Sequence, residues 1–148
     1  QHIKKNDIPT IDEGNDVLIK VLVGKVKNIS SAVQTYSPVS IFDVQFIKPS
    51  LIDLDISKNQ TLMVYIINGE LKFHNDDQIA TKGQMIYFDQ SSDMINLTSI
   101  SPTGSYLVLA GQPLNEPIVR YGPFVANTEG DMKKAMLDYQ NGKMGTLS

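Results

Sequence analysis

The chain has 148 residues, a formal net charge of −3 and no cysteine. Its length allows one domain with a substantial core, and the missing cysteines exclude a thiol nucleophile, a thiolate metal site and a disulfide framework. Because twelve of the thirteen basic residues are scattered lysines and only Arg120 is an arginine, we expect no direct nucleic-acid binding. The apolar runs are far shorter than the roughly 20 residues that span a bilayer, so we expect no membrane segment. The lack of cysteine fits a reducing compartment, so we expect a cytoplasmic location.

The residue balance favours β-structure. Isoleucine and valine together number 27 against five alanines, and branching at Cβ suits a pleated sheet better than a helix. After a polar lead-in of about sixteen residues, short apolar runs alternate with turn signals, which is typical of a sandwich or barrel. We predict strands over residues 17–23, 32–36, 41–47, 61–67, 70–74, 84–88, 94–99 and 106–110.

The best local turn signal is Asn68-Gly69, between two predicted strands. Asparagine and glycine adopt positive φ readily, so this pair predicts a two-residue hairpin turn of type I′. Weaker turn signals of the same kind lie at 75–77, 90–93 and 102–104.

The character of the sequence changes near residue 111. Two prolines in 111–117 exclude a central strand. Thr128 then resembles a helix N-cap, with Asp131 three residues later, and predicts a helix near 129–141. Met132, Met136 and Tyr139 repeat at helical spacing on it. This stripe indicates ordinary packing, with docking on a second domain or subunit as the alternative.

Candidate chemical groups are few and dispersed. His2 and His74 lie far apart without a His-x-His pair, which makes a poor metal site. Asp53 and Asp55 would share one face of a strand, but no further oxygen ligands cluster near them in the sequence. Neither a Gly-x-Ser-x-Gly elbow nor a phosphate-binding glycine loop is present. We therefore expect no catalytic residue and no metal ligand in this chain.

Unlike charges come close together in the proline-rich segment, at Glu116 and Arg120. A buried or half-buried ion pair there would fix the loop before the helix. A contact with a ligand is the alternative.

Residues 111–118 read GQPLNEPI, residues 122–128 read GPFVANT and residues 142–145 read GKMG, with Ala135 and Asp138-Tyr139-Gln140 between them. This ordered pattern resembles the C-terminal signature of the pirin family. Weaker similarity lies upstream, at 7–9, 21–24 and 64–70. The resemblance covers nearly the whole chain but only the second half of a typical pirin.

The resemblance implies a mostly β fold: one cupin-like β-barrel over 1–148, a double-stranded β-helix of the jelly-roll type, with one C-terminal helix. Full-length pirins have two such barrels. Histidines and a glutamate of the N-terminal barrel hold iron, and some members oxidise quercetin. Because this chain begins at Gln1 and matches the second half, we expect the N-terminal metal-binding barrel to be absent from it.

The cupin ligand pattern consists of His-x-His, a glutamate and a further histidine, each spaced from a glycine. Gly69 and Gly83 align this pattern with the chain. The ligand positions then fall on Leu62 for the glutamate, on Ile56 and Lys58 (or Asp55 and Ser57) for the first histidines, and on Met94 for the last. Iron of this class needs imidazole and carboxylate ligands, and only Asp55 has a suitable group. We expect this barrel to hold no metal, with iron only in the absent domain.

The resulting hypothesis is a non-catalytic domain that packs against an N-terminal iron-binding barrel or associates with itself. One alternative is a domain that forms one wall of the site in an iron-dependent quercetin-type dioxygenase. Another is a metal-free module that binds a small molecule or a protein partner. The candidate interface residues are Glu116, Arg120, Phe124, Asn127, Met132, Met136 and Tyr139.

Overall fold

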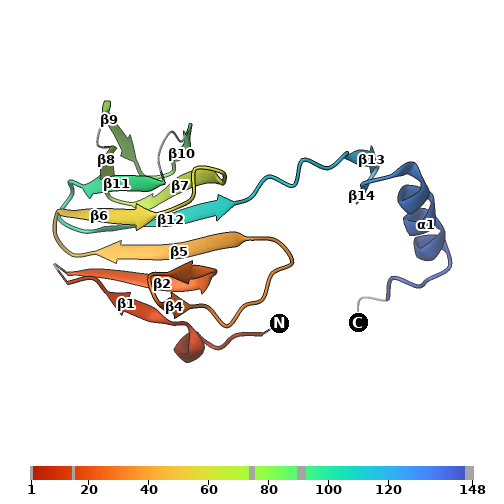
Figure 1. The fold of residues 1–148 in the computed structure, drawn as a ribbon, viewed down its shortest axis with the longest axis horizontal. Coiled ribbons are helices and arrows are strands. Elements are labelled where there is room, and N and C mark those ends of the chain that lie inside the picture. Colours follow the sequence, from red (N-terminus) through yellow and green to blue (C-terminus); the bar gives the residue numbers. More distant parts are fainter. Residues whose placement is uncertain (1, 15, 74–75, 90–92, 146–148) are drawn as a thin grey trace. The chain divides into compact units, whose positions relative to one another are not determined.

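A computed structural model of the chain describes residues 2–14, 16–73, 76–89 and 93–145. Within it the chain divides into two compact units, Gln1–Pro113 and Leu114–Ser148. The first unit is rich in strands and the second carries the helix (Figure 1).

Two antiparallel sheets form the first unit, which begins with a short 3-10 turn, η1 (Lys5–Asp7). The larger sheet has the order β1 (Thr10–Asp12), β2 (Val17–Val23), β5 (Val39–Phe46), β12 (Gly104–Gly111), β7 (Thr61–Asn68) and β10 (Met85–Phe88). The smaller sheet has the order β6 (Ser50–Asp55), β11 (Met94–Ser99), β8 (Glu70–Phe73) and β9 (Asp76–Thr81). A short hairpin joins β3 (Lys25–Val26) to β4 (Ile29–Ser30). The expected mostly β fold of the jelly-roll type is confirmed, although the sheets do not close into a complete barrel.

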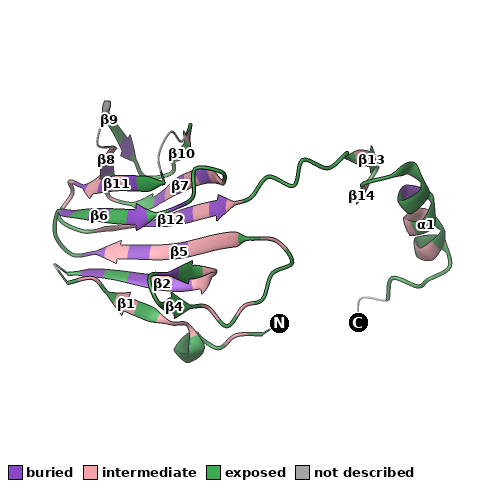
Figure 2. Ribbon diagram, viewed as in Figure 1, coloured by how far each residue is buried: buried purple, intermediate pink, exposed green. Residues whose placement is uncertain are grey.

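Alternation along the strands places the core between the two sheets. Along β6 every second residue is buried, and the same period of two recurs in β2, β7, β11 and β12 (Figure 2). Successive strand residues point to opposite faces, so each sheet turns one apolar face inward. The largest fully buried side chains include Tyr106, Phe42, Phe46, Ile19, Leu62, Ile66, Leu71 and Leu97.

Most predicted strands agree with the structure to within two residues, and those over 17–23 and 94–99 have the observed bounds. The strand predicted over 32–36 is wrong. In this region the Ser31 hydroxyl donates to the Leu22 carbonyl and accepts from the Val33 N–H, while Thr35 donates to the Ser37 carbonyl. Such local bonds satisfy groups that a sheet ladder would otherwise use. Position 74, the end of another predicted strand, lies outside the described residues.

Two strands of the smaller sheet, β6 and β9, fall outside the prediction. Both carry aspartates, which are depleted in strands. In β6 the aspartates occupy the exposed face, and Ile52 and Leu54 occupy the buried one. Tertiary burial of one face therefore overrides the weak local propensity.

The hairpin predicted at Asn68-Gly69 is also wrong. The flanking strands β7 and β8 belong to different sheets and do not pair, so the chain crosses from one sheet to the other at this point. Gly69 has φ 86°, but Asn68 is not among the residues with positive φ, whereas a type I′ turn needs positive φ at both positions. Residues 102–104 likewise link β11 to β12 across the sheets. The other two expected turns, at 75–77 and 90–93, include positions outside the described residues.

The C-terminal unit contains a short antiparallel hairpin, β13 (Val119–Tyr121) and β14 (Phe124–Ala126), followed by α1 (Glu129–Gln140). The helix predicted near 129–141 is confirmed. The Thr128 side chain accepts from the Asp131 N–H at 3.1 Å and donates to the Asp131 carboxylate at 2.6 Å. This satisfies a backbone donor that the first turn leaves without an intrahelical partner.

The crossover at Gly69 yields a stability prediction with a matched control. Gly69 and Gly83 have nearly the same φ, 86° and 84°, but a Cβ at Gly69 would lie 2.6 Å from Ser101 Oγ, whereas at Gly83 nothing lies within 4 Å. Gly83→Ala should cost about 1–2 kcal/mol for its left-handed backbone alone. Gly69→Ala should cost at least about 1 kcal/mol more, because of the steric overlap. Urea unfolding of both variants measures the difference, and equal losses would contradict this account of the crossover.

Candidate functional site

Two of the positions where the cupin pattern would place metal ligands are occupied by core residues. Leu62 on β7 is 1% exposed and Ile56, just after β6, is 3% exposed, and both belong to the apolar cluster between the sheets. Met94 begins β11 and is half exposed. Asp55, paired with Met94 across β6 and β11, lies on the exposed face of its strand. The residues present therefore do not fit an iron site in the interior.

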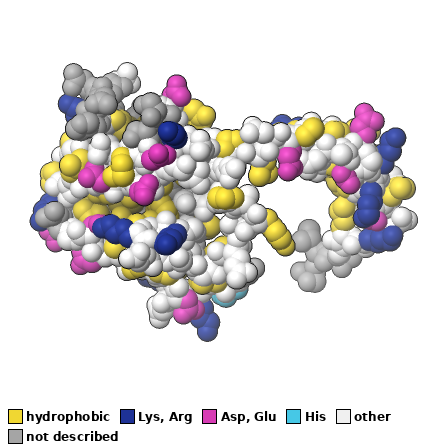
Figure 3. All heavy atoms as spheres, in the orientation of Figure 1, with side chains coloured by type: hydrophobic (Ala, Val, Ile, Leu, Met, Phe, Trp, Pro, Cys, Tyr) yellow, Lys and Arg dark blue, Asp and Glu magenta, His cyan; other side chains and the backbone are white. Residues whose placement is uncertain are grey.

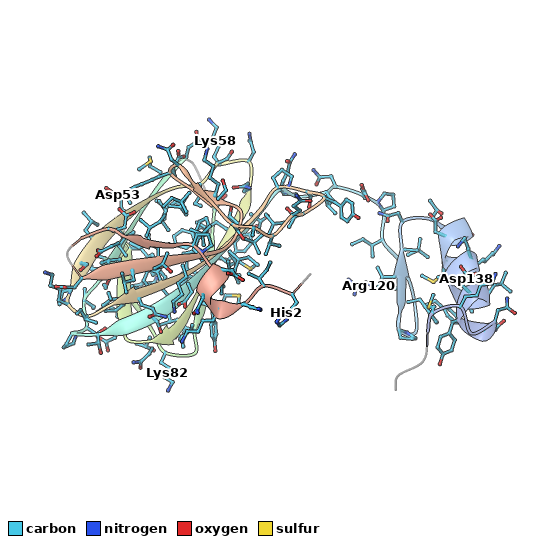
Figure 4. The ribbon with its side chains drawn as sticks, turned by 90° about the horizontal axis from the view of Figure 1, so that it is seen from below. His2, Asp53, Lys58, Lys82, Arg120 and Asp138 are labelled. Atoms are coloured by element: carbon cyan, nitrogen blue, oxygen red, sulfur yellow. The ribbon has the colours of Figure 1, made fainter. Side chains whose placement is uncertain are left out.

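The remaining candidate ligands do not gather either. Asp53 and Asp55 share the exposed face of β6, as expected. Asp53 accepts a hydrogen bond from the Asn96 side chain on the neighbouring strand. His2 is exposed near the N-terminus (Figure 4), and His74 lies outside the described residues. Among the residues that the structure describes, no group of three His, Cys, Asp or Glu side chains is placed to hold a metal ion.

One polar group inside the core stands out. Tyr106 on β12 is fully buried, with its ring centroid 6.4 Å from that of Phe46. Its hydroxyl has no hydrogen-bond partner among the described residues. Burial raises the pKa of this phenol above its ordinary value, because the charged form would lose its hydration. The core therefore keeps Tyr106 neutral.

The first unit has a cleft on its side, which we call the side cleft. It has a volume of about 670 Å³ and runs between β6 and the segments around β2 and β3. The buried part of its apolar lining consists of Val17, Val26, Phe42, Ile52 and Leu54. Figure 3 shows apolar atoms on this face between acidic side chains on one side and basic ones on the other.

Charged residues line the side cleft on both of its walls. Asp53 and Asp55 come from β6, and Asp53 points outward from the surface in Figure 4. Lys25 and Lys27 come from the β3–β4 hairpin, and Lys27 forms an ion pair with Glu13. The side cleft thus combines an apolar floor with a polar rim, and this combination is usual in binding sites.

Two contacts in the C-terminal unit join four of the seven expected interface residues. The rings of Phe124 on β14 and Tyr139 on α1 meet edge to face, with centroids 5.6 Å apart. Met132 is buried and Met136 half-buried on the same helix. Asn127 donates from its side chain to the Glu116 carboxylate at 2.5 Å and to the Pro117 carbonyl at 3.3 Å.

The ion pair expected between Glu116 and Arg120 is not formed. Both residues are exposed and no ion pair joins them, because the Glu116 carboxylate accepts from Asn127 instead. Arg120 lies on β13 (Figure 4). On α1, a hydrogen bond from Lys134 lowers the pKa of the half-buried Asp138 carboxyl and raises the pKa of Lys134.

Comparison with known proteins decides the family. A sequence model described as "Pirin C-terminal cupin domain" matches residues 41–145. The chain belongs to the pirin family. The pirin of Rattus norvegicus is 32% identical over 147 residues, which are 98% of this chain and 50% of that protein. Pirin-1 of Arabidopsis thaliana is 32% identical over 142 residues, which are 94% of this chain and 49% of that protein.

A solved structure agrees with this assignment. The crystal structure of a quercetin 2,3-dioxygenase from Acinetobacter baumannii matches the whole chain with a TM-score of 0.81 and 30% identity, over 51% of that protein. This pirin-family chain therefore spans about half the length of the curated relatives it matches. Of the helices in the described ranges, none is long and apolar enough to span a membrane.

The side cleft is the feature that sequence reasoning missed. Its walls come from residues 13–14, 17, 25–27, 42, 51–55 and 94, which only the tertiary fold brings together. The sequence offered one signal for this cleft, the apolar and acidic residues that alternate in 51–55. This alternation indicates a strand with an exposed acidic face, but it does not show which segments form the opposite wall.

The buried phenol yields a stability prediction. Tyr106→Phe removes the hydroxyl and keeps the ring. Because an unsatisfied buried polar group costs about 1–3 kcal/mol, we expect the free energy of unfolding at pH 7 to rise by about 1 kcal/mol in urea titrations. A loss of stability at pH 7 would contradict this, since it would mean that the hydroxyl has a stabilising partner.

The pH dependence of the same variant gives an independent check. The folded-state pKa of Tyr106 is raised, so below the unfolded pKa of about 10 the phenol is protonated in both states and its ionisation does not change the free energy of unfolding. Above that pH, ionisation favours the unfolded state, and the free energy of unfolding falls by up to about 1.4 kcal/mol per pH unit. The wild type should lose stability above pH 10 more steeply than Tyr106→Phe, and parallel curves would contradict the burial of this phenol.

Proposed function

We propose that this chain is a non-catalytic, metal-free cupin domain that completes a two-domain pirin by packing against an N-terminal iron-binding barrel. Any iron-dependent chemistry, including oxidation of a flavonol such as quercetin, would then belong to the N-terminal domain. The side chains at the ligand positions of this domain carry the proposal.

The chemistry of those positions supports the metal-free part. Leu62 and Ile56 have no atom that can ligate iron, and both pack in the core. Turning them into ligands would bury polar groups without partners, at a cost of several kcal/mol. The interior at this point stabilises the fold by apolar burial.

The C-terminal unit supports the packing part. Among its described residues, Met132 alone is buried. Its exposed large apolar side chains are Leu114, Ile118, Tyr121, Val125, Leu137, Tyr139 and Met144. A segment of this size cannot form an adequate core by itself, and exposed apolar groups of this kind mark contact surfaces. The face around Tyr139 and Met136 is therefore suited to docking on another domain.

The metal-free assignment predicts the metal content of the purified chain. With iron, manganese, nickel, copper or zinc supplied during expression, we expect plasma mass spectrometry to find far less than one metal per chain. The midpoint of thermal unfolding should not change when each metal is added, because only a ligand that binds the folded state raises it. One equivalent of a metal that also raises this midpoint would contradict the proposal.

The docking surface predicts self-association of the isolated chain. Sedimentation velocity at increasing concentration should show dimers or larger species, because exposed apolar side chains of α1 find each other when no partner domain covers them. Tyr139→Lys should weaken this association. Gln140→Lys adds the same charge at the next exposed helix position and should leave it unchanged. A strict monomer that binds no apolar-surface dye would contradict the docking surface.

A further inference from the structure

In the part of the chain that the structure describes, no strand pairs with the outer edge of β6. β6 pairs with β11 on one side and is the first strand of its four-stranded sheet. The Ile56 N–H donates to the Asp93 carbonyl at 2.9 Å, which fixes which residues face β11. Because antiparallel pairing alternates, Leu51, Asp53 and Asp55 direct their backbone N–H and C=O groups away from β11.

This free edge faces the side cleft. All residues from Leu51 to Asp55 line the side cleft, whether their side chains are buried or exposed. A wall made of consecutive strand residues presents backbone as well as side chains. An exposed edge of this kind is a template on which another extended segment can pair.

The side chains of the edge define the chemistry of a partner. Leu51 is 60% exposed, and Asp53 and Asp55 are exposed beside it. Asp55 forms no ion pair with any described residue, and among the described residues only the Asn96 amide contacts the Asp53 carboxylate. On the opposite wall Glu13 compensates the charge of Lys27, and Lys25 forms no ion pair with a described residue. The two carboxylates of Asp53 and Asp55 outnumber this one cation, so the net charge of the side cleft is acidic.

A second copy of the chain does not suit this edge. Two β6 strands paired with each other would bring the carboxylates of Asp53 and Asp55 next to those of the other copy. Like charges directly opposite each other across strands are destabilising. Lysine or arginine at those positions would instead form cross-strand ion pairs.

We propose that β6 binds an extended basic peptide segment of a partner protein, which adds a further strand to the smaller sheet within the side cleft. Lysine or arginine side chains lie opposite Asp53 and Asp55, and the alternate apolar side chains rest on the floor formed by Val17, Val26 and Phe42. The peptide backbone bonds to the outward groups of Leu51, Asp53 and Asp55. This site lies in the first unit and does not depend on the docking surface of α1.

The probe is a short fluorescent peptide of sequence TKVKVLT with blocked ends, titrated into the whole chain by fluorescence anisotropy. We expect saturable binding that weakens as salt rises, because the ion pairs are near the surface. A peptide with glutamate in place of both lysines should not bind. A peptide with N-methyl groups on its strand-pairing amides should lose binding although its charge is unchanged.

Protein variants locate the site. Asp53→Asn combined with Asp55→Asn should weaken binding about fivefold, as two cross-strand ion pairs of about 0.5 kcal/mol each would predict. Glu70→Gln removes a carboxylate from β8 of the same sheet, away from the side cleft, and should leave binding unchanged. Circular dichroism confirms that each variant is folded.

Hydrogen exchange tests strand addition itself. On peptide binding, the amides of Leu51, Asp53 and Asp55 should exchange more slowly, because their outward N–H groups gain acceptors. Equal binding of the N-methylated peptide, or unchanged exchange at these amides, would overturn the proposal. So would equal affinity of the double asparagine variant and the wild type.

Discussion

Burial of alternate strand side chains between two facing sheets is the constraint on which the rest of this structure depends. Fully buried residues such as Val44, Val64 and Leu97 come from three different strands, two in the larger sheet and one in the smaller. Because the side-chain period of a strand is two, every inward position forces its neighbours outward. The aspartates of β6 are exposed for the same reason that Ile52 and Leu54 are buried.

The same constraint governs the chemistry of the interior. A cupin metal site requires polar ligands that project between the sheets, and each such ligand replaces an apolar side chain of the core. In this chain Leu62 and Ile56 occupy two of those positions. A side chain at such a position can either pack in the apolar core or bind a metal, but not both. The Tyr106 hydroxyl is a polar group left without a partner among the described core residues. In the function proposed above, the interior serves stability and recognition falls to the surface.

Two surfaces remain for recognition, and they differ in physical character. The C-terminal unit offers apolar side chains around Tyr139, suited to a permanent contact that excludes water. The side cleft offers backbone hydrogen-bonding groups and the carboxylates of Asp53 and Asp55. Contacts of the second kind depend on salt and on the register of a partner strand. The proposed docking surface and the proposed peptide site therefore use different residues of the chain and different kinds of interaction.

The sequence by itself determined the β-rich class, the strands over 17–23 and 94–99, the helix capped by Thr128 and the family, because periodicity, capping and motif residues act over short distances. Only the tertiary structure decided that the chain changes sheets at Gly69, that 32–36 is irregular and that Glu116 bonds to Asn127 rather than pairing with Arg120. The side cleft also emerged only in three dimensions. Its walls come from segments up to 81 residues apart, from Glu13 to Met94, and local propensity carries no information on which strand edges face each other.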